Sequence, residues 1–139
     1  MGLDRSFSFA PDGQTLATTG TFGQEDGGAV LLWRVADGKL LHTLKMPQEL
    51  TEEPYRPRIG APAFSSDSTQ LVVGTEPVRQ PNIFLIWRVA DGALLKHVEQ
   101  PIRSDLVHFN ADSTALQFYN TRIRDGVRIY TQRLAQEGK

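Results

Sequence analysis

The residues whose chemistry could support catalysis are few and widely spaced. The three histidines stand at His42, His97 and His108, and the chain contains no cysteine. A zinc site needs three or four His, Cys or carboxylate ligands at short spacing, and the sequence holds no such cluster. Without cysteine there are no disulfides, thiolate ligands or thiol nucleophiles. We therefore expect structural histidines, no metal and no cofactor.

Other catalytic signatures are missing as well. There is no G-x-S-x-G or G-x-G-x-x-G motif, and the glycine-rich stretch 20–28 lacks the lysine and the helix of a phosphate-binding loop. Asp12, Asp67 and Asp112 recur at equivalent places in a repeated turn. A catalytic residue would occur once, whereas an aspartate that bonds its own turn is expected to recur. The sequence therefore predicts a protein that is not an enzyme.

The elements that hold these residues belong to an internal repeat. FAPDGQTLATTG (9–20) and AVLLWRVADGKLLHTL (29–44) correspond to FSSDSTQLVVGT (64–75) and IFLIWRVADGALLKHV (83–98). A weaker third copy reads FNADSTALQFYN (109–120) and VRIYTQRL (127–134). The aromatic anchors of the copies, taken in pairs, are Phe9 and Trp33, Phe64 and Trp87, and Phe109 and Tyr130. A period of about 40–45 residues, lengthened by insertions, is that of a propeller blade.

Each copy reads as short strands rather than helices. In the second copy the expected strands are 61–64, 70–75, 82–89 and 94–99, and Asp91-Gly92 is a hairpin signal. The third strands are apolar at successive positions, which indicates a sheet covered on both faces. A sheet packed between two other sheets is a propeller blade. The predicted fold class is all-β, built of four-stranded antiparallel propeller blades.

On these residues the sequence resembles the WD-repeat (WD40-like) family of β-propellers over about residues 3–134. The resemblance rests on F-x-P-D-G-x-x-L at the start of the first copy and on Trp33 and Trp87 near the ends of third strands. The residue after each tryptophan is Arg34 or Arg88 instead of Asp, and no copy carries the opening Gly-His pair, so the repeats are divergent. The resemblance implies a non-catalytic scaffold for protein–protein interaction.

The predicted ring is incomplete. We expect residues 1–139 to form a single partial propeller, with blades at about 6–45, 59–99 and 106–134, the last lacking its outer strand. Propellers usually carry ~4–8 blades. Both flat ends of such a stack would be open and apolar, which monomers avoid. Three explanations remain: a section of a longer propeller, a ring closed by self-association (two chains giving six blades, or three giving nine), or a stable open fragment.

Composition narrows the class of partner. The 15 Lys and Arg balance 16 Asp and Glu, for a net charge of −1. Nucleic-acid binders usually carry a basic excess, so no nucleic-acid partner is expected. No apolar run approaches the ~18 residues of a membrane span, so no membrane partner is expected either. We expect a cytoplasmic protein with an unknown protein partner.

The long connections are the expected partner-binding surface. Connections after second strands (21–28, 76–81 and 121–126) and between blades (45–60 and 99–105) are long and unlike, whereas the others are tight and alike. Because successive strands alternate in direction, the long ones emerge at one end of the blades. Binding residues gather on variable loops, and aromatics and arginines dominate interface energetics. The candidates are Phe22, Tyr55, Arg56, Arg58, Arg79, Arg122 and Arg124.

Two alternatives stay open at this point. These loop charges could be ordinary solvated groups, and 51–58 could serve as a rigid proline-flanked spacer. The rival functional hypothesis is a small-ligand or enzymatic site in the central channel, where inner strands converge. The residues available there offer little convergent chemistry: Ser6, Ser8, Pro62, Ala63, Val107 and His108.

Overall fold

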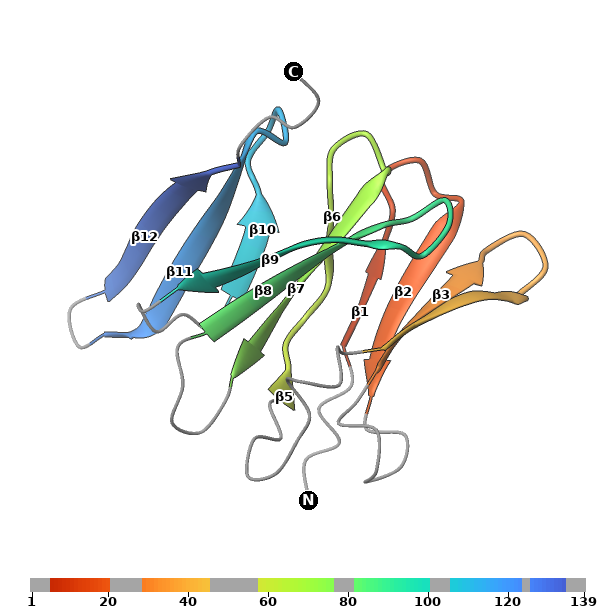
Figure 1. Cartoon of the computed structure of the whole chain (residues 1–139), viewed down its shortest axis with the longest axis horizontal. Coiled ribbons are helices and arrows are strands. Elements are labelled where there is room, and N and C mark those ends of the chain that lie inside the picture. The colour runs from red at the N-terminus through yellow and green to blue at the C-terminus, as the bar shows by residue number, and fades with distance from the viewer. Residues whose placement is uncertain are drawn as a thin grey trace.

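The described part of the chain is built of β-strands alone. The computed structural model describes residues 6–20, 29–45, 58–76, 82–100, 106–123 and 126–134. These residues form three antiparallel sheets that stand side by side (Figure 1). The all-β propeller-blade prediction is confirmed. No helix occurs in the described ranges, and therefore none that could cross a membrane.

The first sheet, blade 1, has the strand order expected of one repeat. Its strands are β1 (Ser6–Phe9), β2 (Thr15–Gly20), β3 (Ala29–Arg34) and β4 (Leu40–Lys45), paired in sequence order. The sheet is a simple up-and-down meander, because each strand pairs antiparallel with the next one in the chain. Its innermost strand is β1 and its outermost is β4.

The second sheet, blade 2, differs from expectation at its inner edge. Its strands are β5 (Arg58–Ile59), β6 (Ala63–Phe64), β7 (Gln70–Glu76), β8 (Asn82–Arg88) and β9 (Leu94–Gln100). Both β5 and β6 pair with β7, so the inner strand is interrupted between them. Pro62 lies in that interruption and has no N–H to donate to the ladder. Arg58, expected in a connecting loop, belongs to β5.

The third sheet, blade 3, has three strands among the residues that the structure describes. They are β10 (Leu106–Phe109), β11 (Ala115–Ile123) and β12 (Gly126–Arg133), in that order. The second strand runs three residues further than the repeat predicted, and only 124–125 separate it from β12. The expected long connection over 121–126 is therefore wrong. Arg122 lies in β11 rather than in a loop.

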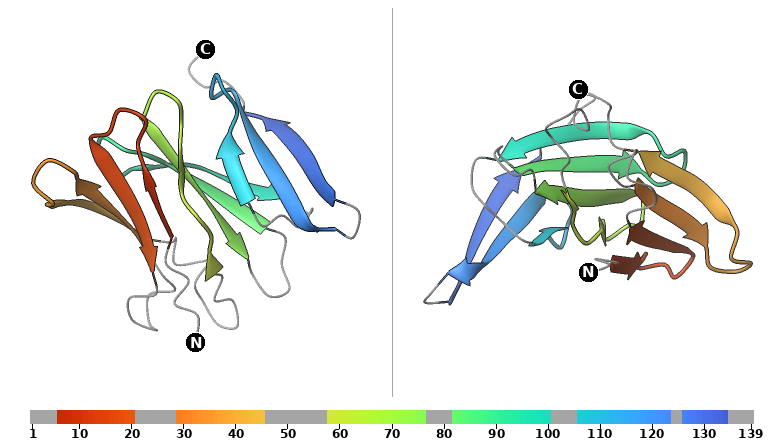
Figure 2. Two further views of the ribbon diagram at one scale, coloured as in Figure 1. Left: turned by 180° about the vertical axis from the view of Figure 1, so that it is seen from behind. Right: turned by 90° about the horizontal axis from the view of Figure 1, so that it is seen from below.

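The blades stack so that each covers its neighbour. Figure 2 shows the inner strands gathered near one line and the outer strands fanned away from it. We call the face of a blade that points to the next blade in the chain its forward face, and the opposite one its rear face. The forward face of blade 1 packs on the rear face of blade 2 through one hydrophobic cluster, consisting of Ala17, Val30, Leu32 and Leu44 with Leu71, Val73, Ile83, Leu85 and Trp87.

A second cluster joins the forward face of blade 2 to the rear face of blade 3. It contains Val72, Phe84 and Ile86 from blade 2 and Val107, Phe109 and Leu116 from blade 3. Neighbouring residues of β8 thus enter different clusters, because successive side chains of a strand point to opposite faces. Both faces of blade 2 are covered, which explains the unbroken apolar run Ile83–Trp87.

Strand register corrects one of the predicted anchors. Trp33 pairs with Leu16 and Trp87 with Leu71, but the matching residue of β11, Leu116, pairs with Gln132. The backbone confirms the shift, since the N–H groups of Val35, Val89 and Leu134 donate to Gln14, Thr69 and Thr114 in turn. The tryptophan position of blade 3 is therefore Gln132, and Tyr130 lies two residues before it. The aromatic ring suggested an equivalence that the pairing does not support.

Serine hydroxyls connect the turns of neighbouring blades. Ser68 and Ser113 have left-handed backbones, with φ of 65° and 61°. The Asp12 N–H donates to Ser68 Oγ at 3.1 Å, and the Ser66 N–H donates to Ser113 Oγ at 3.0 Å. Gly13 holds the same left-handed place in blade 1, with open space around it. Left-handed φ costs a side chain roughly 1–2 kcal/mol, and the hydrogen bonds between blades offset part of that cost.

Substitution of Ser68 separates the cost of its left-handed backbone from the contribution of its hydrogen bond between blades. Ser68→Ala keeps the unfavourable backbone and loses the interblade hydrogen bond, which should lower the free energy of unfolding by about 1–2 kcal/mol. Ser68→Gly loses the same bond but removes the backbone strain, so its loss should be smaller by about 1 kcal/mol. Urea denaturation followed by fluorescence measures both. Gly13→Ser is the matched control, because it adds the strain without a partner; a stabilised Gly13→Ser chain would contradict this account.

Candidate interaction surface

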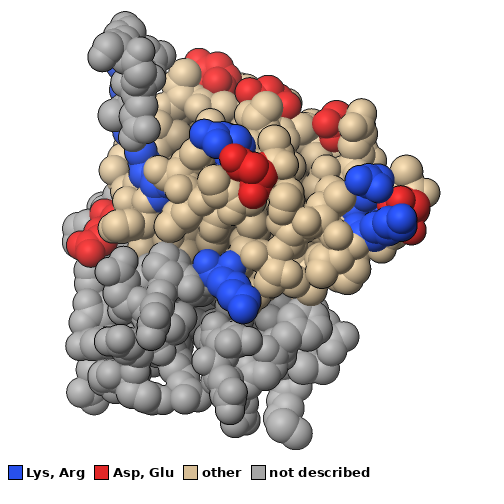
Figure 3. Space-filling model, turned by 45° about the vertical axis from the view of Figure 1, so that its right-hand side comes forward, with Lys and Arg blue, Asp and Glu red and all other residues tan. Residues whose placement is uncertain are grey.

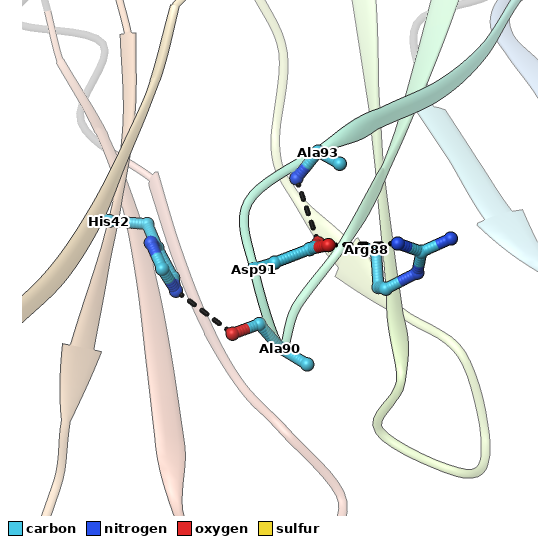
Figure 4. A network of polar contacts seen from close by, with 5 residues as sticks. All are labelled: His42, Arg88, Ala90, Asp91 and Ala93. Atoms are coloured by element: carbon cyan, nitrogen blue, oxygen red, sulfur yellow. Dashed lines mark hydrogen bonds and ion pairs between the residues drawn. The ribbon is translucent and has the colours of Figure 1, made fainter.

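The WRVADG segment is a structural turn with its own ion pair. Arg88 Nη1 lies 2.8 Å from Asp91 Oδ2, and Asp91 Oδ1 accepts the Ala93 N–H at 3.1 Å (Figure 4). Blade 1 repeats the arrangement with Arg34 and Asp37 at 3.0 Å. Hydrogen bonding to the backbone N–H of Ala93 holds the pKa of Asp91 below its usual value, and the ion pair adds to this. The arginine that replaces the usual aspartate of a WD pair therefore has a local structural partner.

The turn aspartates are used in the same structural way. Asp67 Oδ1 accepts the Thr69 hydroxyl at 2.6 Å, the Ser65 hydroxyl at 2.7 Å and the Thr69 N–H at 3.1 Å. These hydrogen bonds hold the pKa of Asp67 below its ordinary value, the Thr69 hydroxyl contributing most. Asp112 bonds the Thr114 hydroxyl and N–H, and its pKa is lowered for the same reason. Asp12 accepts the Gln14 N–H at 2.9 Å.

The histidines do not meet. His42 lies on β4 and contacts the turn of blade 2, where its Nε2 is 3.2 Å from the Ala90 carbonyl oxygen (Figure 4). His97 is exposed on β9, and His108 lies on β10 with its Nδ1 against the carbonyl oxygen of Phe109. Among the described residues no three His, Cys, Asp or Glu side chains gather as metal ligands would. The geometry offers no catalytic constellation in this part of the chain.

The rear face of blade 1 is the most distinctive surface of the described chain. Trp33 corresponds by register to Trp87, and Leu16 to Leu71. In blade 2 these residues are 2% and 0% exposed, because blade 1 covers them. In blade 1 both are only partly buried, and Phe9 is 54% exposed. The same residue types thus form a buried contact in one blade and a surface in the other.

This surface is hollowed and apolar. A shallow hollow of about 360 Å³ is lined by Phe9, Leu16, Thr18, Trp33, Arg34, Val35 and Gly38. Phe7 lies beside it at 68% exposure, with its ring edge-on to that of Phe9 at 6.2 Å between centroids. Figure 3, which turns blade 1 forward, shows mostly uncharged residues on this side, with a few small groups in which Lys or Arg lies beside Asp or Glu. The Trp33 indole N–H donates to Thr18 Oγ1 at 2.9 Å, so the polar atom of the ring is satisfied within the blade.

The sequence predicted open apolar surfaces at both ends of the stack, and the structure shows one of them on blade 1. Large exposed apolar patches mark interaction sites in soluble proteins. At the other end of the stack, the forward face of blade 3 carries His108, Gln117 and Thr131 at successive paired positions.

The loop candidates fall mainly outside the described residues. Five of them, Phe22, Tyr55, Arg56, Arg79 and Arg124, lie there, whereas Arg58 is in β5 and Arg122 in β11. The second strands β2, β7 and β11 all end at the lower edge of Figure 1. The segments that follow them therefore leave the blades at one edge, as strand alternation predicted. The candidates on these segments stay a prediction.

Comparison with known proteins supports the fold. No protein family and no curated protein sequence matches the chain. Solved structures do match: the RRP9 WD40 repeats (18% identity, TM-score 0.61) and the Myceliophteria thermophila Cps50 (Swd1) β-propeller domain (13%, 0.63). TolB from Acinetobacter baumannii also matches (17%, 0.62). The three matches cover 94%, 94% and 96% of this chain but 36%, 39% and 32% of those structures. The fold is thus WD40-like, and the chain spans less than half the length of each structure.

Proposed function

We propose that this chain is a non-catalytic protein-interaction module made of WD40-like blades. The observation that carries the proposal is the rear face of blade 1, where Phe9 and Val35 are exposed and Trp33 is only partly buried. Their counterparts in blade 2, Phe64, Val89 and Trp87, pack in the cluster between blades 1 and 2. Leaving such a face in water costs roughly 25 cal/mol for each Å² of apolar surface, so a covering protein surface is favoured. The WD40-like fold of the neighbours fits this role.

The proposed module has a second docking surface in the long connections at the lower edge of the blades. Tyr55, Arg56 and Arg58 are the proposed contacts there, because tyrosine and arginine are enriched at interface hot spots. A rigid stack of blades that presents variable segments at one edge is the general arrangement by which scaffolds bind partners. No described cluster of titratable groups favours the channel-site alternative.

A quantitative pull-down with the immobilised chain tests this function. The variants are Tyr55→Ala/Arg56→Ala/Arg58→Ala for the loop surface and Phe9→Ser/Val35→Ser for the rear face of blade 1. Leu94→Ser is the matched control, because Leu94 is also an exposed apolar residue, at 41%, but lies on β9 of blade 2. We expect a captured protein to be lost with at least one variant and kept with the control. Equal capture by all chains, or no capture by the original chain, would contradict the proposal.

A further inference from the structure

The contact between blades 1 and 2 shows in detail what the rear face of a blade receives. The outer strand β4 places Leu44 in the hydrophobic cluster that also contains Trp87. Two residues earlier, and on the same face of the strand, His42 lies over the turn of blade 2 (Figure 4). Its Nε2 is 3.2 Å from the Ala90 carbonyl oxygen, and its Cγ is 3.2 Å from the place that a Cβ on Gly92 would take. A flat ring and a leucine at alternate positions of one strand therefore make this contact.

The turn of blade 1 repeats the part of this surface that receives the ring. Residues 34–38 and 88–92 have the same sequence. In each turn the last residue, Gly38 or Gly92, donates its N–H to the carbonyl of the first, at 2.8 and 2.9 Å, and both glycines have φ of 71°. The Ala36 carbonyl thus takes the same place in its turn as the carbonyl that the ring of β4 contacts. A Cβ on Gly38, however, would have no atom within 4 Å. The place for a ring is present on blade 1 and open.

Blade 2 also shows where such a contact ends. Leu40 pairs with Trp33 as Leu94 pairs with Trp87. Leu94 is 41% exposed although blade 1 covers the rear face of blade 2, and Leu40 is 48% exposed. The cover reaches the tryptophan position and the turn but leaves the first residue of the outer strand in solvent. An occupant of the rear face of blade 1 should therefore cover Trp33 and leave Leu40 exposed.

Within the described ranges, the outer strands of this chain are already packed on their own neighbours. The ring and the leucine of β4 both contact blade 2. In β9 the matching positions are Lys96 and Val98, and Val98 packs on the cluster between blades 2 and 3. The described strands of blade 3 are β10, β11 and β12, which match the first three strands of blade 1. A strand that fills the place on blade 1 is thus best supplied by a different protein.

We infer that the rear face of blade 1 binds a β-sheet of another protein whose exposed strand carries a flat N–H donor, such as histidine, and a leucine at alternate positions. The ring lies over Gly38 and donates to the Ala36 carbonyl oxygen, while the leucine packs on Trp33. Glycine leaves room for the ring, and the carbonyl oxygen requires a donor. This inference rests on the proposed interaction function and names the class of its partner.

A cyclic hairpin peptide with the sequence of residues 29–45 is the probe that tests the site. Ala29 and Lys45 are paired, so an added Asn-Gly turn closes the peptide and keeps β3 and β4 together. The probe is titrated into the isotope-labelled full chain, whose two tryptophans give two indole N–H signals in the NMR spectrum. We expect the Trp33 signal to move and the signal of the covered Trp87 to stay. A Trp33 signal that does not move at roughly 2 mM probe, where even a millimolar complex forms, would overturn the inference.

Paired substitutions locate the ring and the leucine. In the probe, Leu44→Ser should weaken binding roughly 10–100-fold and His42→Ala roughly 2–10-fold. In the chain, Gly38→Ala should weaken binding of the original probe roughly 10-fold, because its Cβ enters the place of the ring, but should not weaken binding of the His42→Ala probe. Leu40→Ser in the chain is the matched control and should leave binding unchanged. If Gly38→Ala weakens both probes equally, the ring does not lie over this turn and the inference is wrong.

Two further measurements separate this partner from other occupants of the face. The Trp33 signal of the chain alone should not move between roughly 10 µM and 1 mM. Movement would assign the face to a second copy and overturn the inference. In the pull-down, a protein that the Phe9→Ser/Val35→Ser chain fails to capture should be displaced from the original chain by the probe, and not by its Leu44→Ser variant. Capture without displacement would contradict the inference and leave the proposed function standing.

Discussion

Replacing Trp87 with alanine should destabilise the chain by about 3–5 kcal/mol, the range for a large aromatic removed from a core. Its side chain is 2% exposed and lies in the cluster that holds blades 1 and 2 together. The substitution therefore removes packing on both sides of a contact between blades. Urea or guanidinium unfolding followed by circular dichroism measures the loss.

The same substitution at Trp33 provides the comparison, because both tryptophans occur in an identical WRVADG segment. Trp33 is only partly buried, so Trp33→Ala should cost about 1–2 kcal/mol from lost apolar contact and from the lost bond to Thr18. Equal losses at the two sites would show that the two faces are buried alike.

The glycines of the two tight turns should also respond unequally. Gly38 and Gly92 both have φ of 71°, so alanine at either place incurs left-handed strain of roughly 1–2 kcal/mol. A Cβ at Gly38 would meet open space, whereas one at Gly92 would lie 3.2 Å from Cγ and 3.3 Å from Cβ of His42. We expect Gly38→Ala to cost about 1 kcal/mol and Gly92→Ala about 2–3 kcal/mol in the free energy of unfolding.

A double-mutant cycle assigns the difference to the contact between blades. In the His42→Ala chain the added Cβ at position 92 has room, so Gly92→Ala should then cost about as much as Gly38→Ala. The hydrogen bond of His42 to the Ala90 carbonyl is lost in both arms of the cycle and cancels. If the excess cost of Gly92→Ala persists without the histidine ring, the close approach of β4 to this turn is not its cause.

The internal repeats allowed most of the fold to be predicted from the sequence. The WRVADG copies and the Asp-Gly turns predicted the strands of blades 1 and 2 to within a few residues. They could not locate the tryptophan position of blade 3, because strand pairing depends on backbone register and places Gln132 there in preference to the aromatic Tyr130. Nor could they show the break at Pro62 in the inner strand of blade 2. Side-chain identity is a poor guide to equivalent positions where the copies of a repeat differ, because backbone hydrogen bonds set the pairing.

The candidate interaction surface could be predicted from the sequence only in part. An open apolar end follows from counting blades, and the structure places it on β1, β2 and β3. The serine contacts between blades could not be predicted from the sequence. Serine is common in turns, and its residue type does not indicate a left-handed backbone. The sequence also did not show that Gln117 takes the position of Val72, or that Thr131 takes the position of Leu32 and Ile86. These equivalences follow from the strand register.

The Ser68 hydroxyl has a consequence for how the chain assembles during folding. The forward face of blade 1 covers the rear face of blade 2, and the rear face of blade 1 itself has a similar set of residues. Exchange between such interchangeable repeats is a common route to misassembly. Ser68 accepts the Asp12 N–H, whereas Gly13, at the same place in blade 1, has no side chain to do so. The Ser68 hydrogen bond should therefore favour the contact of blade 1 with blade 2 over a contact with another copy of blade 1.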